Sequence, residues 1–271
     1  MRRLGQNIQG YRGHCIDPDR VAHAIVQQAA LDGWSTHLLD ASPSIRLPVL
    51  QRPARPQKPR PLRCYLSAGI HGDEPAGPLA LLDMVRSRSF PNNIDLTLCP
   101  VLNPRGLHAN DRFNTDGIDL NRDYNHLRAP ETSAHVHWLA SQPPWDLTLL
   151  LHEDWESAGF YLYELHPDTH LGLADPVIAS VSRVCPIELA PVIDGRDAYA
   201  PGIIRPSIDP AARPDWPEAF WLLQNRTQRN LTLEAPSDFP MALRVGALVE
   251  AVMAAIHAIS RIASPSPRPS P

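Results

Sequence analysis

A histidine and a glutamate stand three residues apart in the segment "SAGIHGDEPAG", residues 67–77. His71 directly follows the apolar run 62–70, and Glu74 precedes Pro75. Imidazole nitrogens and carboxylate oxygens are ligands that zinc accepts. The same two residues could instead form a surface pair at the start of a helix, where a carboxylate and a proline are both favoured. The choice between these alternatives depends on the rest of the chain.

Other polar residues follow other apolar runs. His152 ends "WDLTLLLH" (145–152), Glu234 ends "RNLTLE" (229–234), and "NPRG" follows "IDLTLCPVL" (94–102). The carboxyl ends of parallel strands share one edge of a sheet, so these side chains can converge. We therefore expect one zinc ion per chain. Two imidazoles and one carboxylate leave a position for water, as in catalytic zinc sites, and the expected ligands are His71, Glu74 and His152.

Each of these residues also has an ordinary structural interpretation. His152 could be a buried histidine that is hydrogen-bonded at a strand end, and Glu234 could cap a helix that begins near Asp238. Glu153 and Asp154 could orient the metal ligands or could simply be solvated. Convergence of several strand ends favours the metal interpretation over these alternatives.

Apolar periodicity predicts an α/β fold. Helical spacing occurs at 21–31, 75–85, 131–140, 214–225 and 241–259, and strand-like runs occur at 35–40, 45–51, 62–70, 94–102, 145–152, 159–165 and 229–234. Buried strands that alternate with helices indicate one domain, with a mixed, mostly parallel central sheet and helices on both faces. We place this domain at 1–263 and interpret the Pro- and Ser-rich segment 264–271 as a disordered tail.

Composition narrows the class of protein. The 271 residues suit one large domain, and the net charge of −4 gives no reason to expect nucleic acid or a membrane as a partner. No apolar region follows Arg2 and Arg3, so no secretory signal is visible, and we expect a cytoplasmic location. The longest apolar stretch, near 241–260, is interrupted by charged residues, so we expect no transmembrane span.

The cysteines and a proline-rich segment each allow more than one interpretation. The four cysteines are scattered without a CxxC pair, so we expect buried thiols rather than disulfides or a structural zinc site. The segment "PARPQKPRP" (53–61) could be a polyproline ligand for a partner domain, although a solvated loop between strands is the simpler interpretation.

Taken together, these residues resemble the zinc carboxypeptidase family, which includes the succinylglutamate desuccinylase and aspartoacylase branch. The similarity begins with the H-x-x-E of His71 and Glu74 and continues through "NPRGLHANDRFNTDGIDLNRDYN" (103–125). It closes with His152 in "LLLHED" and Glu234 in "TLEAP". The resemblance covers residues 62–236, whereas the first 60 residues and the closing helix match only in general character.

The resemblance implies roles for particular residues. Zinc would activate a water molecule and polarise the scissile carbonyl, and Glu234 would act as the general base and pass the proton to the leaving amine. Arg112 would help to stabilise the oxyanion. Asn121 and Arg122 would bind the substrate's carboxylate, since the guanidinium offers a fork of donors; the alternative for both arginines is ordinary surface ion pairing. Some family members close a tyrosine over the substrate, and Tyr199 is the candidate here.

The function that follows is a zinc-dependent, carboxypeptidase-like hydrolase that cleaves an amide bond next to a free carboxylate. Its substrate would be a peptide, including a cell-wall peptide. The alternative enzyme is an N-acyl amino acid deacylase, because that branch shares the same ligands. "GFYLYEL" after the third ligand and "TLEAP" around the glutamate favour the peptidase. An inactive zinc-binding scaffold is a third alternative, but a scaffold has no need of Glu234 or Arg112. The sequence predicts neither the oligomeric state nor the physiological substrate.

Overall fold

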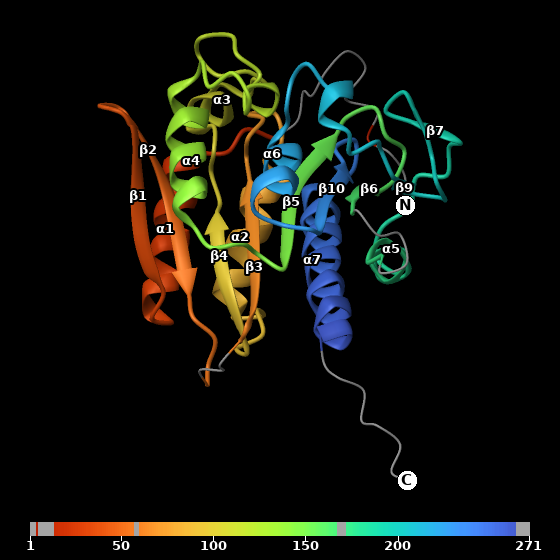
Figure 1. Cartoon of the computed structure of the whole chain (residues 1–271), viewed down its shortest axis with the longest axis horizontal. Helices are drawn as coiled ribbons and strands as arrows, with labels where there is room; N and C mark the ends of the chain where they lie inside the picture. Colours follow the sequence, from red (N-terminus) through yellow and green to blue (C-terminus); the bar gives the residue numbers. More distant parts are fainter. Residues whose placement is uncertain (1–3, 5–13, 57–59, 167–171, 264–271) are drawn as a thin grey trace.

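The computed structural model describes residue 4 and residues 14–56, 60–166 and 172–263. Its strands are β1 (Ser35–Ser42), β2 (Ile45–Arg52), β3 (Leu62–Ala68), β4 (Ile94–Cys99), β5 (Leu147–Asp154), β6 (Tyr161–Leu165), β7 (Val192–Ile193), β8 (Arg196–Asp197), β9 (Ile203–Ile204) and β10 (Asn230–Pro236). Eight of them form one sheet in the order β1-β2-β4-β3-β5-β10-β6-β9, which runs from left to right in Figure 1. Strands β7 and β8 form a separate hairpin.

The four central strands of the sheet are parallel. Strand β3 pairs in parallel with β4 and β5, and β5 pairs in parallel with β10. Strands β2 and β6 flank this block with antiparallel pairing. The carboxyl ends of β3, β4, β5 and β10 therefore share one edge of the sheet, as the sequence predicted.

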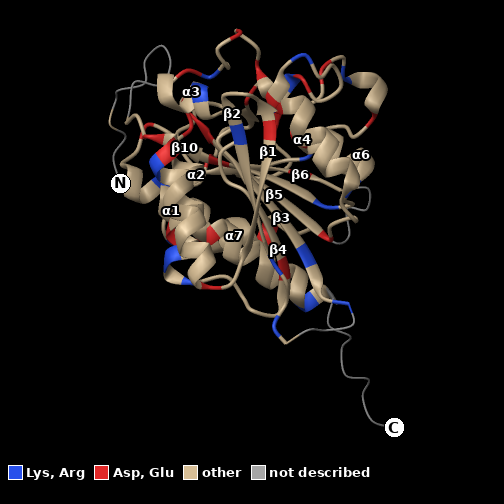
Figure 2. Ribbon diagram, turned by 90° about the vertical axis from the view of Figure 1, so that its left-hand side faces the viewer, with Lys and Arg blue, Asp and Glu red and all other residues tan. Residues whose placement is uncertain are grey.

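Helices cover both faces of the sheet (Figure 2). One layer contains α1 (Pro18–Leu31), α2 (Ala76–Ser87), α5 (Ala174–Val181) and α7 (Met241–Ala263), and the other contains α4 (Pro130–Ser141) and α6 (Glu218–Asn225). Alternate residues of the central strands supply the two cores: Leu149 of β5 packs with the first layer and Leu150 with the second. The prediction of a mixed, mostly parallel sheet with helices on both faces is confirmed.

Helix α7 is long and apolar enough to span a membrane when only its length and composition are considered. Its apolar residues pack in the protein interior, because Leu248, Val252 and Ile256 are fully buried in the first core. Arg244 in its first turns is also buried, where it pairs with Glu153. The composition of α7 is thus that of a helix packed on a sheet.

The predicted helices and strands overlap observed ones, but several short elements were not predicted. These are the helices α3 (Pro104–Ala109), η1 (Leu120–Arg122), η3 (Pro210–Ala212) and α5, with the strands β7, β8 and β9. The predicted tail 264–271 lies outside the described residues, as do residues 57–59 of the Pro-rich segment 53–61. The domain bounds and the alternatives for that segment therefore stay predictions.

Candidate metal centre and active site

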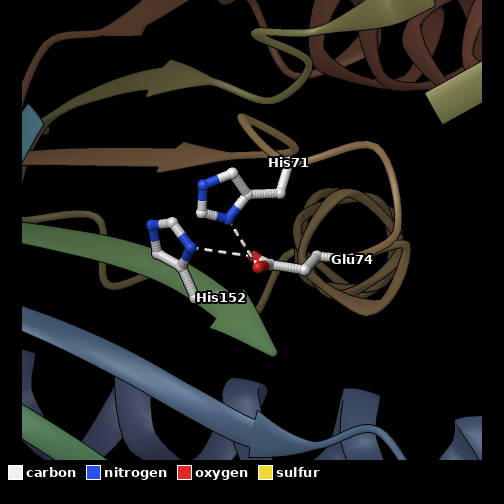
Figure 3. A group of neighbouring side chains, drawn as sticks. All are labelled: His71, Glu74 and His152. Carbon is white, nitrogen blue, oxygen red and sulfur yellow. Dashed lines mark hydrogen bonds and ion pairs between the residues drawn. The ribbon is translucent and has the colours of Figure 1, made fainter. Parts of the chain in front are cut away.

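Three potential zinc ligands meet at the carboxyl edge of the sheet (Figure 3). His71 lies in the turn after β3, Glu74 lies just before α2, and His152 lies in β5. The Nδ1 atoms of His71 and His152 lie 2.6 Å and 2.8 Å from the two carboxylate oxygens of Glu74. Ligand atoms of all three residues lie within 4.8 Å of one another, and all three residues are buried.

Glycine permits the turn that carries two of these ligands. Gly72 lies between His71 and Glu74 and packs against α3, where a Cβ on Gly72 would lie 2.0 Å from the carbonyl carbon of Gly106. Any side chain at this position would push the turn off α3. Asn103 stabilises the start of α3, the helix against which Gly72 packs. Its side chain caps this helix by accepting a hydrogen bond from the amide of Gly106 at 2.9 Å.

The chemistry of the three residues fits zinc. The Nε2 of His71 lies 3.2 Å from Oδ1 of Asp119, so a proton on Nε2 can be donated to that carboxylate. This contact leaves Nδ1 of His71 free to act as a ligand on the side of Glu74. A carboxylate behind a ligating histidine fixes the ring and its tautomer in many metal sites. Two imidazole nitrogens and one carboxylate are a donor set of catalytic zinc.

Electrostatics at the centre favour a cation. Burial disfavours the imidazolium of His71, but Glu74 and Asp119 outweigh it and raise the pKa of His71 to about 9. Burial lowers the pKa of His152, and the negative charge of Glu74 offsets only part of this decrease. Burial opposes ionisation of Glu74, yet the two histidines bring its pKa well below the usual range. The carboxylate is therefore ionised, and it stabilises positive charge between the two imidazoles.

Glu234 lies next to the metal ligands. It is the direct partner of His152 in the pairing of β10 with β5, and both line a cavity of about 370 Å³. Burial, together with the negative charges of Glu74 and Asp154, raises the pKa of Glu234 well above its ordinary value. A carboxyl group with a raised pKa can both accept and return a proton near neutral pH. Glu234 is part of β10 rather than a cap on α7, which begins at Met241.

Arg112 is held at the rim of the metal centre. Its Nε and Nη2 each lie 3.1 Å from Oδ2 of Asp119, and its Nη1 lies 3.9 Å from Oε1 of Glu74. Asp119 thus contacts both Arg112 and His71. The guanidinium lines the cavity and is anchored by a carboxylate, so it can face developing negative charge without rearrangement.

Asn121 and Arg122 line the same cavity. The side-chain oxygen of Asn121 accepts a hydrogen bond from the amide of Glu218 at 2.9 Å, which leaves its side-chain nitrogen as the end that can donate to a ligand. Nη1 of Arg122 donates to the carbonyl of Asn121 at 2.8 Å. Both residues predicted to bind a carboxylate therefore have hydrogen-bond donors available at the same cavity.

The residues next to His152 have different environments. Glu153 is buried, accepts hydrogen bonds from the amide of Ala76 at 2.6 Å and from Arg244 at 2.7 Å, and so joins the end of β5 to α2 and α7. Asp154 accepts a hydrogen bond from the hydroxyl of Tyr161 at 3.0 Å. Among the described residues, neither side chain is hydrogen-bonded to a metal ligand, and neither is simply solvated.

Tyr199 does not line the cavity in this structure. Its side chain is exposed, and the guanidinium carbon of Arg205 lies 3.8 Å from the centre of its ring. Two other tyrosines, Tyr161 and Tyr163 of β6, do line the cavity. Tyr199, the residue predicted to close over a substrate, therefore lies outside the cavity that contains the metal centre.

Several cavity residues were not predicted from the sequence. Arg196 and Asp194 reach the cavity from the β7–β8 hairpin, and Arg213 reaches it from the residue after η3. The hairpin did have a sequence signal. Asp194 and Gly195 have φ of 46° and 65°, and Asp-Gly is a favoured pair for a two-residue hairpin turn. No comparable pattern marks Arg213.

Comparison with known proteins gives one family model. Residues 61–170 match the succinylglutamate desuccinylase/aspartoacylase catalytic domain. The chain is also 33% identical over 91 residues to carboxypeptidase SOL1 of Arabidopsis thaliana, a match that covers 26% of this chain and 18% of that protein. The chain is therefore similar to this catalytic domain and to a carboxypeptidase, in agreement with the resemblance predicted from the sequence. Its match spans less than a fifth of the length of this curated relative.

Solved structures named as a metallopeptidase and a metallo-carboxypeptidase share the fold. A candidate metallopeptidase from Shewanella denitrificans has a TM-score of 0.74 and 23% identity, with 89% of each chain covered. A metallo-carboxypeptidase from Pseudomonas aeruginosa, in complex with (2-guanidinoethylmercapto)succinic acid, has a TM-score of 0.65 and 17% identity, with 90% of this chain and 68% of that chain covered. The predicted fold is confirmed.

Proposed function

We propose that this chain is a zinc-dependent hydrolase that cleaves an amide bond next to a free carboxylate. One observation carries the proposal: a potential zinc centre, a carboxyl group of raised pKa, and several guanidinium groups line a single cavity. When bound by His71, Glu74 and His152, zinc supplies Lewis-acid polarisation of a carbonyl and a more acidic water. A scaffold that only binds zinc would have no need of Glu234 in this position.

The roles of the surrounding residues follow from their chemistry. Glu234 takes a proton from the attacking water at its carboxylate and delivers that proton to the leaving nitrogen. Arg112, anchored by Asp119, donates to the carbonyl oxygen as negative charge develops on it. Asn121 and Arg122 donate to the substrate's free carboxylate and so fix which amide bond lies over the metal centre.

A peptide is the substrate that we favour, including a cell-wall peptide. The matched structures are named as metallopeptidases or carboxypeptidases. A second candidate is an N-acyl amino acid, since residues 61–170 match the desuccinylase and aspartoacylase domain. Both reactions break an amide next to a free carboxylate, so the same residues serve either one. We also propose a cytoplasmic location, as expected from the sequence.

A substrate screen tests the proposal. The zinc-loaded protein would be assayed with free-carboxylate dipeptides, cell-wall peptides and N-acyl amino acids, each beside a Glu234→Gln control. We expect turnover of at least one class by the wild type and almost none by the control. Hydrolysis that persists at the wild-type rate in Glu234→Gln would exclude the proposed mechanism.

A further inference from the structure

Two segments that are far apart in the sequence, residues 121–125 and 214–218, lie side by side at the cavity. Three hydrogen bonds join them, and these run from the Tyr124 amide to the Trp216 carbonyl, from the Asn125 side chain to the Pro214 carbonyl, and from the Trp216 amide to the Asn125 side chain. We call the two segments together the clamp unit. Its members Asn121, Arg122 and Pro217 line the cavity, and the first two are the proposed carboxylate-binding residues.

Glu218 joins the clamp unit to strand β3. Its backbone amide donates to Oδ1 of Asn121 at 2.9 Å. Its side chain is fully buried, and the carboxylate accepts hydrogen bonds from Tyr65 at 2.7 Å and from Ser67 at 2.8 Å. Both hydroxyl donors belong to β3, the strand that leads into the turn with His71. One residue therefore contacts the proposed carboxylate-binding segment and the strand that leads to the metal ligands.

A second set of contacts closes a ring of hydrogen bonds. The hydroxyls of Tyr65 and Tyr124 lie 2.9 Å and 2.8 Å from Nε2 and Nδ1 of His135. Because the hydroxyl of Tyr65 donates to Glu218, it accepts from Nε2 of His135, and Nδ1 then accepts from Tyr124. Tyr124 belongs to the same segment as Asn121, so the contacts return to the clamp unit. All five side chains of this hydrogen-bond ring are buried.

The hydrogen-bond ring restricts movement of the clamp unit relative to β3. Apolar contacts are non-directional, whereas each hydrogen bond weakens when its distance or angle changes. A substrate whose carboxylate is bound by Asn121 and Arg122 has its amide at the metal ligands only when these residues lie at the right distance. Misplacement by about 1 Å can slow a reaction by about 10²-fold. Small movements of the clamp unit would therefore reduce the rate of hydrolysis.

We propose that Glu218 is a positioning residue, whose carboxylate holds the clamp unit at the distance from the metal ligands that the reaction requires. This inference rests on the proposed function. It assigns two separate tasks to one residue, because the backbone amide of Glu218 orients Asn121 and the side chain anchors the clamp unit to β3. A substitution of the side chain removes the anchor and retains the contact with Asn121.

Steady-state kinetics separate these two tasks. Glu218→Leu removes the acceptor of both β3 hydroxyls, so we expect kcat to fall at least about tenfold while KM stays within about threefold of the wild-type value. Glu218→Gln should keep kcat within about threefold of the wild type, because its oxygen can accept from Tyr65 and its nitrogen can donate to Ser67. An unchanged kcat in folded Glu218→Leu, a loss confined to KM, or an equal loss of kcat in Glu218→Gln would overturn the proposal.

The assays are run at about pH 8.5, above the pKa of Glu218, which burial raises to about 7. Tyr65→Phe removes only the hydroxyl between Glu218 and His135, and it decides the test if Glu218→Leu does not fold. Its kcat should fall at least about threefold with KM unchanged, and an unchanged kcat would then overturn the proposal.

Thr148→Val is the matched control. It removes a buried hydroxyl from β5, at the opposite end of the strand from His152, where Thr148 contacts Asn230. Its kcat and KM should equal those of the wild type even if its melting temperature falls. Thermal melting of every variant establishes that it is folded.

A cobalt(II) ion in place of zinc tests the positioning without turnover. The pseudocontact shift of the Asn121 side-chain amide depends on where this group lies relative to the ion. The shift should be the same in the wild type, Glu218→Gln and Thr148→Val, and it should change in Glu218→Leu. A wild-type shift in Glu218→Leu would mean that the carboxylate does not position the clamp unit.

The two proposals fail in different ways. If the shift changes in Glu218→Leu but the wild type hydrolyses no amide next to a free carboxylate, the hydrolase proposal fails, and Glu218 still positions Asn121 relative to the metal. If the wild type hydrolyses such amides, and Glu218→Leu changes neither kcat nor the shift, the hydrolase proposal stands and the positioning role does not exist.

Discussion

His152 and His71 both direct Nδ1 toward Glu74, so loss of one imidazole leaves an incomplete donor set. We predict that the wild type binds one zinc per chain and that His152→Ala loses at least about tenfold in zinc affinity, because even residues behind the ligands commonly contribute that much. Titration against a zinc-binding dye measures this affinity. His137→Ala on the exposed side of α4 is the control and should bind zinc as the wild type does. Wild-type affinity in His152→Ala would refute the ligand assignment.

A second prediction concerns the side chain of Glu234. Glu234→Gln preserves the size of the side chain but cannot accept a proton, so we expect kcat to fall by about 10²–10⁴. Zinc content and melting temperature should stay close to those of the wild type, since Glu234 is not among the clustered ligands. A reduction of only a few-fold in kcat/KM would mean that Glu234 has a structural role alone.

At the scale of secondary-structure elements, one buried ion pair links the end of β5 to the helices behind the site. Nη1 of Arg244 on α7 lies 2.7 Å from Glu153, and the other oxygen of Glu153 accepts from the first residue of α2. Both side chains are almost fully buried. Removing one member of such a pair leaves an unpaired charge in the interior.

We therefore predict that Arg244→Met lowers the free energy of unfolding by about 3–5 kcal/mol. Urea denaturation measures this change. The double variant Arg244→Met with Glu153→Gln should be less destabilised than the sum of the two single variants, because neither charge then remains unpaired. Arg261→Met, at the exposed end of the same helix, serves as the matched control. Additive effects in the double variant would show that the pair is not coupled.

The elements also explain how far the sequence predicts this site. Buried strands have clear apolar runs, and parallel strands must end at one edge, so the convergence of His71, His152 and Glu234 could be predicted before the structure was known. The presence of Arg196 and Arg213 at the cavity could not be predicted, because both residues lie in or beside short elements without apolar periodicity. The Asp194–Gly195 turn predicts a hairpin, but no local pattern predicts where a hairpin packs.

At the scale of the whole molecule, a buried polar network lies behind the cavity in the second core. The carboxylate of Glu218 accepts hydrogen bonds from Tyr65 at 2.7 Å and from Ser67 at 2.8 Å. Tyr65 and Tyr124 both contact the ring of His135. Burial raises the pKa of Glu218 to about 7, although the two hydroxyl donors partly oppose this rise, and burial lowers the pKa of His135 to about 3.

This network predicts a pH dependence of stability. The folded protein holds the proton of Glu218 more tightly than the unfolded chain, so its stabilising effect is complete below the ordinary pKa of 4.5 and is lost as pH rises through about 7. The wild type should therefore lose up to about 3 kcal/mol relative to Glu218→Gln over this range. Denaturation at several pH values measures the difference. His135 is present in both proteins, and a stability difference between them that is constant with pH would contradict this prediction.

The central claim for the molecule is that its cavity recognises a free carboxylate and hydrolyses the adjacent amide. The most direct measurement is kcat/KM of the zinc-loaded wild type for one substrate as the free acid and as the carboxyl amide. Amidation leaves Arg122 without its charged partner, so we predict a loss of at least about tenfold, by the usual 1.4 kcal/mol per decade. Arg122→Ala should weaken turnover of the acid and narrow the gap between the two forms. Equal kcat/KM of acid and amide in the wild type would contradict the claim.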